Sequence, residues 1–195
     1  MNPTRISCFA ALLALSTVGC SSEPEEVEPK PVLTFTPAES EAPAVNRIIV
    51  SELQDASTAA NELTLAVDAE DIDRLYGGTF TLLYDPEVVT IDELNPGELL
   101  ADGFLVSSLE REEATPGELA IGFSLGAAPG DIAVSGRLAT LSIHAQEADP
   151  SGIDFLASGY ANGSRVRALV AVDGVAIAGT RWLGGSLVWV VPEPE

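Results

Sequence analysis

Residues 75–86 read LYGGTFTLLYDP and decide how the rest of the chain is interpreted. Apolar Phe80 and Leu82 alternate with Thr79 and Thr81, which is the pattern of a β-strand with one buried face. An Asp-Pro pair then ends the run, because proline cannot continue a central strand. One face of the expected strand carries Phe80, Leu82 and Tyr84, and the other carries Gly77, Thr79, Thr81 and Leu83.

Short segments of the same kind recur along the chain and are separated by turn residues. Residues 63–67 and 137–145 alternate with a period of two, and Pro-Gly pairs at 96–97 and 116–117 mark turns. An acidic turn is expected over 68–73, and a short helix or turn near 92–100. Strands are expected over 46–53, 63–67, 79–84, 88–91, 104–109, 118–125, 137–145, 152–160, 166–172, 174–178 and 186–191. Turn signals every eight to twelve residues predict an all-β sandwich.

Composition limits the kinds of partner. The 195 residues carry a net charge of −21 and are 46% hydrophobic, which suits one domain with appendages. Nucleic-acid binding is excluded because it needs clustered Lys and Arg. Anionic lipid headgroups would also repel this chain, whereas a basic or cation-carrying partner would suit it.

The N-terminus has the features of an export signal. Arg5 precedes an apolar run over 6–18 that is too short to span a bilayer. Gly19-Cys20 then resembles the lipobox of bacterial lipoproteins, although Thr17 stands where Leu is usual. The resemblance implies a signal peptide over 1–19 and lipidation at Cys20, hence a cell-envelope protein at the outer membrane or cell surface. An ordinary secretory signal is the alternative.

Acidic and Pro-rich sequence separates this signal from the main domain. Residues 20–44 contain too few apolar residues for a core and are expected to form a disordered linker, with an incidental strand over 32–36 as an alternative. The sandwich is expected over 45–192, and 193–195 form a short tail.

The order of several motifs resembles the cohesin family. They are the opening stretch 75–86, PGELL at 96–100, FSLG at 123–126, SGRLATL at 135–141, GIDF at 152–155 and GSLVWV at 185–190. The resemblance covers about residues 46–191. It implies a nine-stranded β-sandwich with jelly-roll topology and a non-catalytic role in docking dockerin modules, whose calcium loops present helices to one sheet face. The fold superfamily also includes cellulose-binding modules.

The same resemblance indicates a partner-binding face. Type I cohesins place an Asn and an Asp before the Tyr-Asp-Pro motif, where this chain has Gly77 and Thr79, and a later acidic contact falls near Leu125. The resemblance therefore supports the cohesin fold for this chain more strongly than it supports a dockerin as the partner. The expected face comprises Gly77, Thr79, Thr81, Leu83 and Leu125.

No catalytic or metal-binding set can be assembled from the sequence. His144 is the only histidine and is expected on the surface, and the acidic residues of 68–73 do not have EF-hand spacing. Neither an enzyme activity nor a cofactor is expected, and calcium would come only with a dockerin. Glu110, Glu112 and Glu113 are interpreted as an ordinary charged turn.

Two binding functions therefore remain, and a structural envelope component with no soluble ligand is a third hypothesis. The first is a lipoprotein that displays a cohesin-like module for a dockerin-type partner in polysaccharide degradation, and that meets the membrane only through its lipid. The alternative is direct binding of a polysaccharide. That alternative needs exposed coplanar rings, for which the candidates are Tyr76, Tyr84, Tyr160, Trp182 and Trp189.

Overall fold

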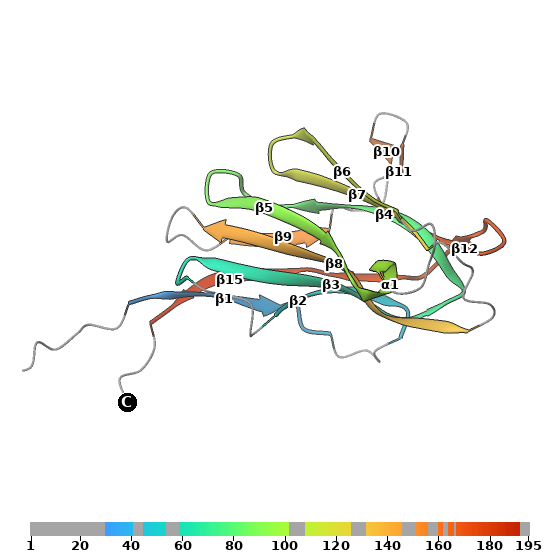
Figure 1. The fold of residues 1–195 in the computed structure, drawn as a ribbon, viewed down its shortest axis with the longest axis horizontal. Helices are drawn as coiled ribbons and strands as arrows, with labels where there is room; N and C mark the ends of the chain where they lie inside the picture. Colours follow the sequence, from blue (N-terminus) through green and yellow to red (C-terminus); the bar gives the residue numbers. More distant parts are fainter. Residues whose placement is uncertain are drawn as a thin grey trace, which may run out of the picture.

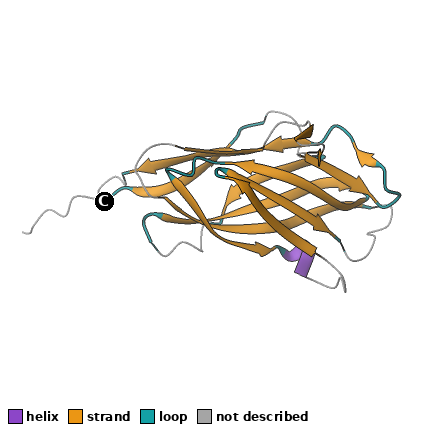
Figure 2. Cartoon of the chain, turned by 90° about the horizontal axis from the view of Figure 1, so that it is seen from above, coloured by secondary structure: helices purple, strands orange, loops and turns teal. Residues whose placement is uncertain are grey.

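The protein is a two-sheet β-sandwich, as the sequence predicts. The computed structural model describes residues 30–40, 45–53, 59–101, 108–125, 132–145, 151–155, 160–161, 164–165 and 167–191. Most of this part of the chain is strand, with one short helix (Figure 2). The expected count of nine strands is approximate, because the described residues form sheets of eight, five and two strands.

Strand β4 lies inside the larger sheet and has neighbours on both edges (Figure 1). One edge pairs with β7, which in turn pairs with β6. The other edge pairs with β12 over its first part and with β9 at its end, and β9 continues to β15 and β1. The strands are β1 (Val32–Pro37), β4 (Leu75–Leu83), β6 (Ser108–Thr115), β7 (Glu118–Ser124), β9 (Ser151–Phe155), β12 (Arg167–Ala171), β13 (Ala176–Ile177) and β15 (Gly185–Val190).

The second sheet has the order β14-β2-β3-β8-β5. Strands β14 and β2 pair in parallel, and the other pairings are antiparallel. A separate hairpin of β10 (Tyr160–Ala161) and β11 (Ser164–Arg165) lies between β9 and β12 in the chain. The second sheet comprises β2 (Arg47–Glu52), β3 (Glu62–Asp73), β5 (Val89–Pro96), β8 (Ala133–Ala145) and β14 (Arg181–Leu183), with α1 (Glu98–Ala101) following β5.

One hydrophobic core fills the space between the sheets. It is built by alternation: Phe80 and Leu82 of β4 are fully buried, and so are Leu119 and Ile121 of β7. Tyr84 packs against this core, as expected. A bulge opposite Val170 and Ala171 of β12 shifts the alternation at the start of β4, which buries Leu75 and leaves Tyr76 exposed.

Strand β1 corrects the predicted linker. Residues 32–37, which were expected to be disordered, pair along all of β15. Leu33 and Phe35 point into the core at 2% and 6% exposure. The other edge of the strand is also satisfied, because the Leu33 N–H donates to the Ala60 carbonyl and the Phe35 N–H to the Glu52 carboxylate. Two apolar residues suffice here because β15 supplies a ready edge.

The acidic turn predicted over 68–73 was wrong. These residues continue β3 and pair with β8 through two irregularities. Asp71 has φ 50°, a left-handed conformation that Asp tolerates better than most residues, so the strand accommodates the extra residues as a distortion. Strand β8 correspondingly begins at Ala133, four residues before the strand that the sequence predicts over 137–145.

The N-terminal predictions lie outside the described residues. These are the signal peptide, Cys20 and the first part of the linker, together with the tail over 193–195. Within the described part, no helix has the length and apolar character needed to cross a membrane. The chain enters β1 beside the end of β15, since Val32 pairs with Val190, so both ends of the sandwich leave it together (Figure 1).

Candidate functional site

The outer side of β4, β7 and β12 forms a continuous face of small and uncharged residues. Register places them in rows: Thr79 lies between Gly122 of β7 and Ala168 of β12, and Gly77 lies between Ser124 and Val170. We call this the docking face, after the partner-binding face that the sequence predicts on β4. It comprises Gly77, Thr79, Thr81, Leu83, Ala120, Gly122, Ser124, Ala168 and Val170.

The strands of this face approach one another closely. A Cβ at Gly77 would lie 2.8 Å from the Phe123 carbonyl oxygen of the neighbouring strand. Thr81 is only 8% exposed although it points away from the core. A Cβ at Gly122, in contrast, would meet nothing within 4 Å, so the face is open at that point.

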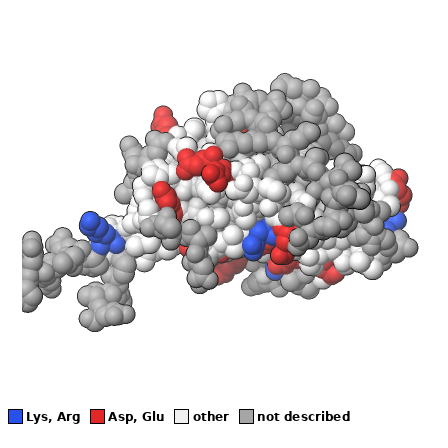
Figure 3. Space-filling model, viewed as in Figure 1, with Lys and Arg blue, Asp and Glu red and all other residues white. Residues whose placement is uncertain are grey.

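Charged residues lie at the border of the docking face, and none lies within it. At its end, Leu83 lies between Glu118 of β7 and Asp154 of β9. None of the nine residues of the face is charged, in a chain with 30 acidic and 9 basic residues. Elsewhere acidic side chains form separate groups, and basic ones are few on the side of the molecule seen in Figure 3.

Four of the predicted site residues share this face, and one does not. Gly77, Thr79, Thr81 and Leu83 line β4 as predicted. Leu125 does not belong with them, because its side chain is only 1% exposed and is part of the core. It lies just past the end of β7, where alternation after the outward-facing Ser124 turns it inward.

Sequence reasoning missed the contributions of the neighbouring strands. Ala120, Gly122 and Ser124 alternate with the buried residues of β7, so the local pattern could have predicted that they share a face. Ala168 and Val170 alternate similarly around Leu169. No local pattern, however, indicates that β7 and β12 are the strands beside β4.

The aromatic residues do not form an exposed strip in the described part of the chain. Tyr76 is exposed, but Tyr84, Trp182 and Trp189 are half-buried and pack against the core. The Trp182 ring lies 5.9 Å from the Phe80 ring between the two sheets. The side chain of Tyr160 lies outside the described residues. The described rings therefore give no flat platform for stacking a sugar.

The acidic residues of β3 are held by cations of the outer side of the second sheet. Asp68 lies 3.3 Å from the Arg137 guanidinium and accepts a hydrogen bond from the Ser51 hydroxyl, and Glu70 pairs with Arg47. Burial raises the pKa of Asp68, and Arg137 opposes that rise. Within the described ranges no three His, Cys, Asp or Glu residues are grouped to hold a metal ion.

His144 is partly exposed, with its side chain at 39%, and its Nε2 lies 3.0 Å from the Asn61 amide nitrogen. Its Nδ1 is 4.0 Å from the Glu62 carboxylate. His144 therefore lies at the surface, as the sequence predicts. Glu110, Glu112 and Glu113 lie in strand β6 rather than in the charged turn that the sequence suggested.

Comparison with known protein families shows to which family the chain belongs. The model of the cohesin domain matches residues 49–180, which is more than half of the chain. The chain belongs to the cohesin family. Cohesins are non-catalytic docking modules, which agrees with the expectation of protein–protein docking and of no enzyme activity.

Solved cohesin structures share the sandwich. A type II cohesin, A11, from Bacteroides cellulosolvens is 14% identical, with 73% of this chain and 98% of that chain covered and a TM-score of 0.56. The second type II cohesin module of the adaptor ScaA scaffoldin from Acetivibrio cellulolyticus is 16% identical, with coverages of 77% and 91% and a TM-score of 0.52.

The type II cohesin dyad of the same scaffoldin is also similar. It is 16% identical with a TM-score of 0.54, and 76% of this chain matches 49% of that chain. The present cohesin therefore spans about half the length of the dyad. At these identities the likeness concerns the fold. No curated protein matches the sequence.

Proposed function

We propose that this cohesin docks a dockerin-type module through the docking face. The observation that carries the proposal is the uncharged surface of three hydrogen-bonded strands, centred on Thr79 with Gly122 and Ala168 beside it. Small side chains on a flat sheet allow the backbone of a partner helix to approach closely. A stable interface would bury about 800 Å² on each partner, so it would extend beyond the nine residues of the face.

The charge of the cohesin supports a cation-carrying partner. A dockerin holding calcium would bring positive charge toward Glu118 and Asp154 at the border of the face. Calcium would belong to the partner, because the described residues of this chain offer no group to bind it. The absence of charge within the face means that apolar contact supplies the affinity, while the border sets the orientation.

A tryptophan at Gly122 tests this assignment. A Cβ at Gly122 meets no atom within 4 Å, so the fold should persist, while the indole would lie on the docking face and block the partner. The matched control is Ser142→Trp on the second sheet, where Leu141 and Ile143 are buried and Ser142 faces outward.

The assay is calorimetric titration with purified dockerin modules, in calcium and in chelator. Gly122→Trp should weaken binding by at least about 30-fold, the effect of losing one central hot spot, and Ser142→Trp should bind like the unaltered chain. The proposal is wrong if no dockerin binds in calcium, or if both variants bind equally well.

We also propose that Cys20 carries a lipid that anchors the cohesin in the cell envelope. The support is the lipobox-like sequence before Cys20 and the start of β1 at Val32. Residues 21–31 would then be the tether, with a reach of at most about 40 Å. Its short length would keep the module near the membrane, with the docking face available to a soluble partner.

Fatty-acid labelling in cells tests the anchor. Cys20 should incorporate the label and hold the protein in the membrane fraction, and Cys20→Ser should release it, with Cys8→Ser as the matched control. A soluble, unlabelled protein would refute the anchor without touching the docking proposal. A role in polysaccharide degradation follows if the dockerin that binds is joined to an enzyme of that class.

A further inference from the structure

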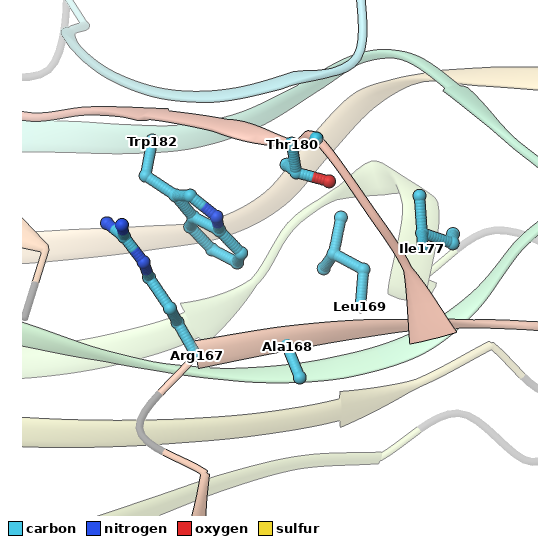
Figure 4. Close-up of a pocket in the computed structure, with 7 residues that line it drawn as sticks. Arg167, Ala168, Leu169, Ile177, Thr180 and Trp182 are labelled. Atoms are coloured by element: carbon cyan, nitrogen blue, oxygen red, sulfur yellow. The ribbon is translucent and has the colours of Figure 1, made fainter. Parts of the chain in front are cut away.

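A cavity of 180 Å³ lies between β12, β13 and β14, on the inner side of the sheet that carries the docking face. Leu169, Ile177 and Trp182 contribute apolar side chains to its lining, Arg167 and Thr180 contribute polar ones, and Ala168 and Gly179 complete it (Figure 4). Gly179 is exposed, so the cavity opens to solvent beside it.

Arg167 occupies an unusual place for a charged residue. It pairs in register with Phe80, which is fully buried, so both residues lie on the inner side of the sheet. Its guanidinium carbon is 5.8 Å from the centre of the Trp182 ring, and Figure 4 shows the side chain running beside the indole. A cation over an aromatic face is attractive, but that contact satisfies none of its N–H donors.

The Nε of Arg167 is buried and, within the described part of the protein, has no hydrogen-bond partner. Arg47, Arg74 and Arg137 each lie within 4 Å of a carboxylate, whereas no such ion pair is found for Arg167 among the described residues. A buried donor on a charged group without an acceptor is costly, so this position favours the binding of an acceptor.

We propose that this cavity binds a monocarboxylate on a short aliphatic group. The planar guanidinium matches the two oxygens of a carboxylate, and its single charge balances one negative charge. Leu169 and Ile177 offer an apolar wall for the alkyl part. Thr180 donates its hydroxyl hydrogen to the Asn46 amide oxygen at 3.1 Å, so it adds no donor for the second charge of a phosphate.

The size of the cavity limits the ligand. Sites for drug-sized molecules measure about 300–1,000 Å³, and 180 Å³ suits only a few heavy atoms. Two sources supply such a group, namely a free short-chain acid and the C-terminal carboxylate of a peptide. Ala168 also lines the cavity, but its side chain points away from those of Arg167 and Leu169, so the cavity and the docking face lie on opposite sides of β12 (Figure 4).

The test uses the unaltered chain and two probes of nearly equal shape, propionate and propionamide. The Arg167 Nε–Hε and Trp182 indole resonances are followed by NMR during titration. Propionate should move both saturably, and propionamide should not. Equal shifts with both probes, or shifts that never saturate with propionate, would overturn the proposal. Acetylated tripeptides with a free or an amidated C-terminus identify the source, since tighter binding of the free form than of propionate assigns a peptide.

Variants provide an independent readout. Arg167→Gln should weaken propionate binding about tenfold or more, because a charge-assisted hydrogen bond is lost. Arg74→Gln is the control, since Arg74 pairs with Asp173 on the exposed surface. If Arg167→Gln binds as well as the control, the assignment is wrong. If it does not fold, the two probes on the unaltered chain still decide.

Discussion

Alanine at Gly78 is expected to destabilise the cohesin, whereas alanine at Gly122 on the adjacent strand is not. Gly78 lies on the inner side of β4, in register with Phe123 of β7 and Leu169 of β12. A Cβ there would come within 2.7 Å of a Leu169 methyl, 2.8 Å of the Ala168 carbonyl oxygen and 3.0 Å of the Phe123 ring. The methyl and the ring can shift, but the carbonyl belongs to a paired strand and cannot yield cheaply.

The magnitude follows from two opposing effects. Overpacking a core usually costs about 1–3 kcal/mol, and replacing glycine by alanine in a strand returns about 0.5–1 kcal/mol. Gly78→Ala should therefore lower the free energy of unfolding by roughly 1 kcal/mol. Gly122→Ala meets no atom within 4 Å and should raise it by about 0.5–1 kcal/mol.

The difference between the two variants is more informative than either value. Replacing glycine by alanine stabilises the strand backbone equally in both variants. The difference between their free energies of unfolding therefore reports overpacking alone, at about 1–3 kcal/mol, or roughly 2–12 °C in Tm for a chain of this size. Urea unfolding followed by tryptophan fluorescence measures it, with equal m-values as the sign that the unfolded states match. If Gly78→Ala proves as stable as Gly122→Ala, the close packing of β4 between β7 and β12 is wrong.

Three further outcomes test other parts of the molecule. Phe35→Ala should cost about 3–5 kcal/mol in urea unfolding because its ring is buried, whereas a β1 that is an incidental part of a linker would leave stability unchanged. Glu52→Ala should cost about 1–3 kcal/mol by leaving the Phe35 N–H without its acceptor, and Glu52→Gln, which keeps an acceptor oxygen, should recover most of the loss. Burial raises the pKa of Asp68 above its ordinary 3.8, so its contribution to stability is present below that pH and is lost as pH rises through the folded-state pKa. Asp68→Asn should remove this part of the pH dependence, and an unchanged difference between unfolding free energies at low and neutral pH would contradict it.

The sequence predicted what alternation and turn chemistry determine. Period two in residues 79–84 and 139–145 correctly identified inward and outward faces, because a strand with one buried face must alternate, but it placed Leu138 outward although that residue is fully buried. The same argument could not show which strands lie beside β4, since lateral pairing depends on distant parts of the chain. For this reason four residues of the docking face were predicted, and the five from β7 and β12 were not.

The errors also have local physical causes. Leu125 was assigned by counting along the family pattern, and one residue past Ser124 is enough to reverse its side. The segment 32–37 has too few apolar residues to fold alone, but it needs only two where β15 offers an unpaired edge. Irregular pairing concealed the strand over 68–73, because extra residues without partners look like a turn in the sequence.

The two proposed sites use opposite sides of one strand, β12, and this arrangement explains the alternating composition of that strand. Ala168 and Val170 face outward and keep the docking face small and neutral, while Arg167 and Leu169 face inward and line the cavity. Moving the arginine by one position would place a cation in the centre of the docking face and leave the cavity without a donor. A strand of alternating small and functional residues can therefore hold two separate sites without a loop, provided that its register on β4 is fixed. A Cβ at Gly78 would press on the Leu169 methyl and on the Ala168 carbonyl oxygen of β12, so the alanine variant there is expected to disturb both sites, whereas changes at Gly122 should reach only the docking face.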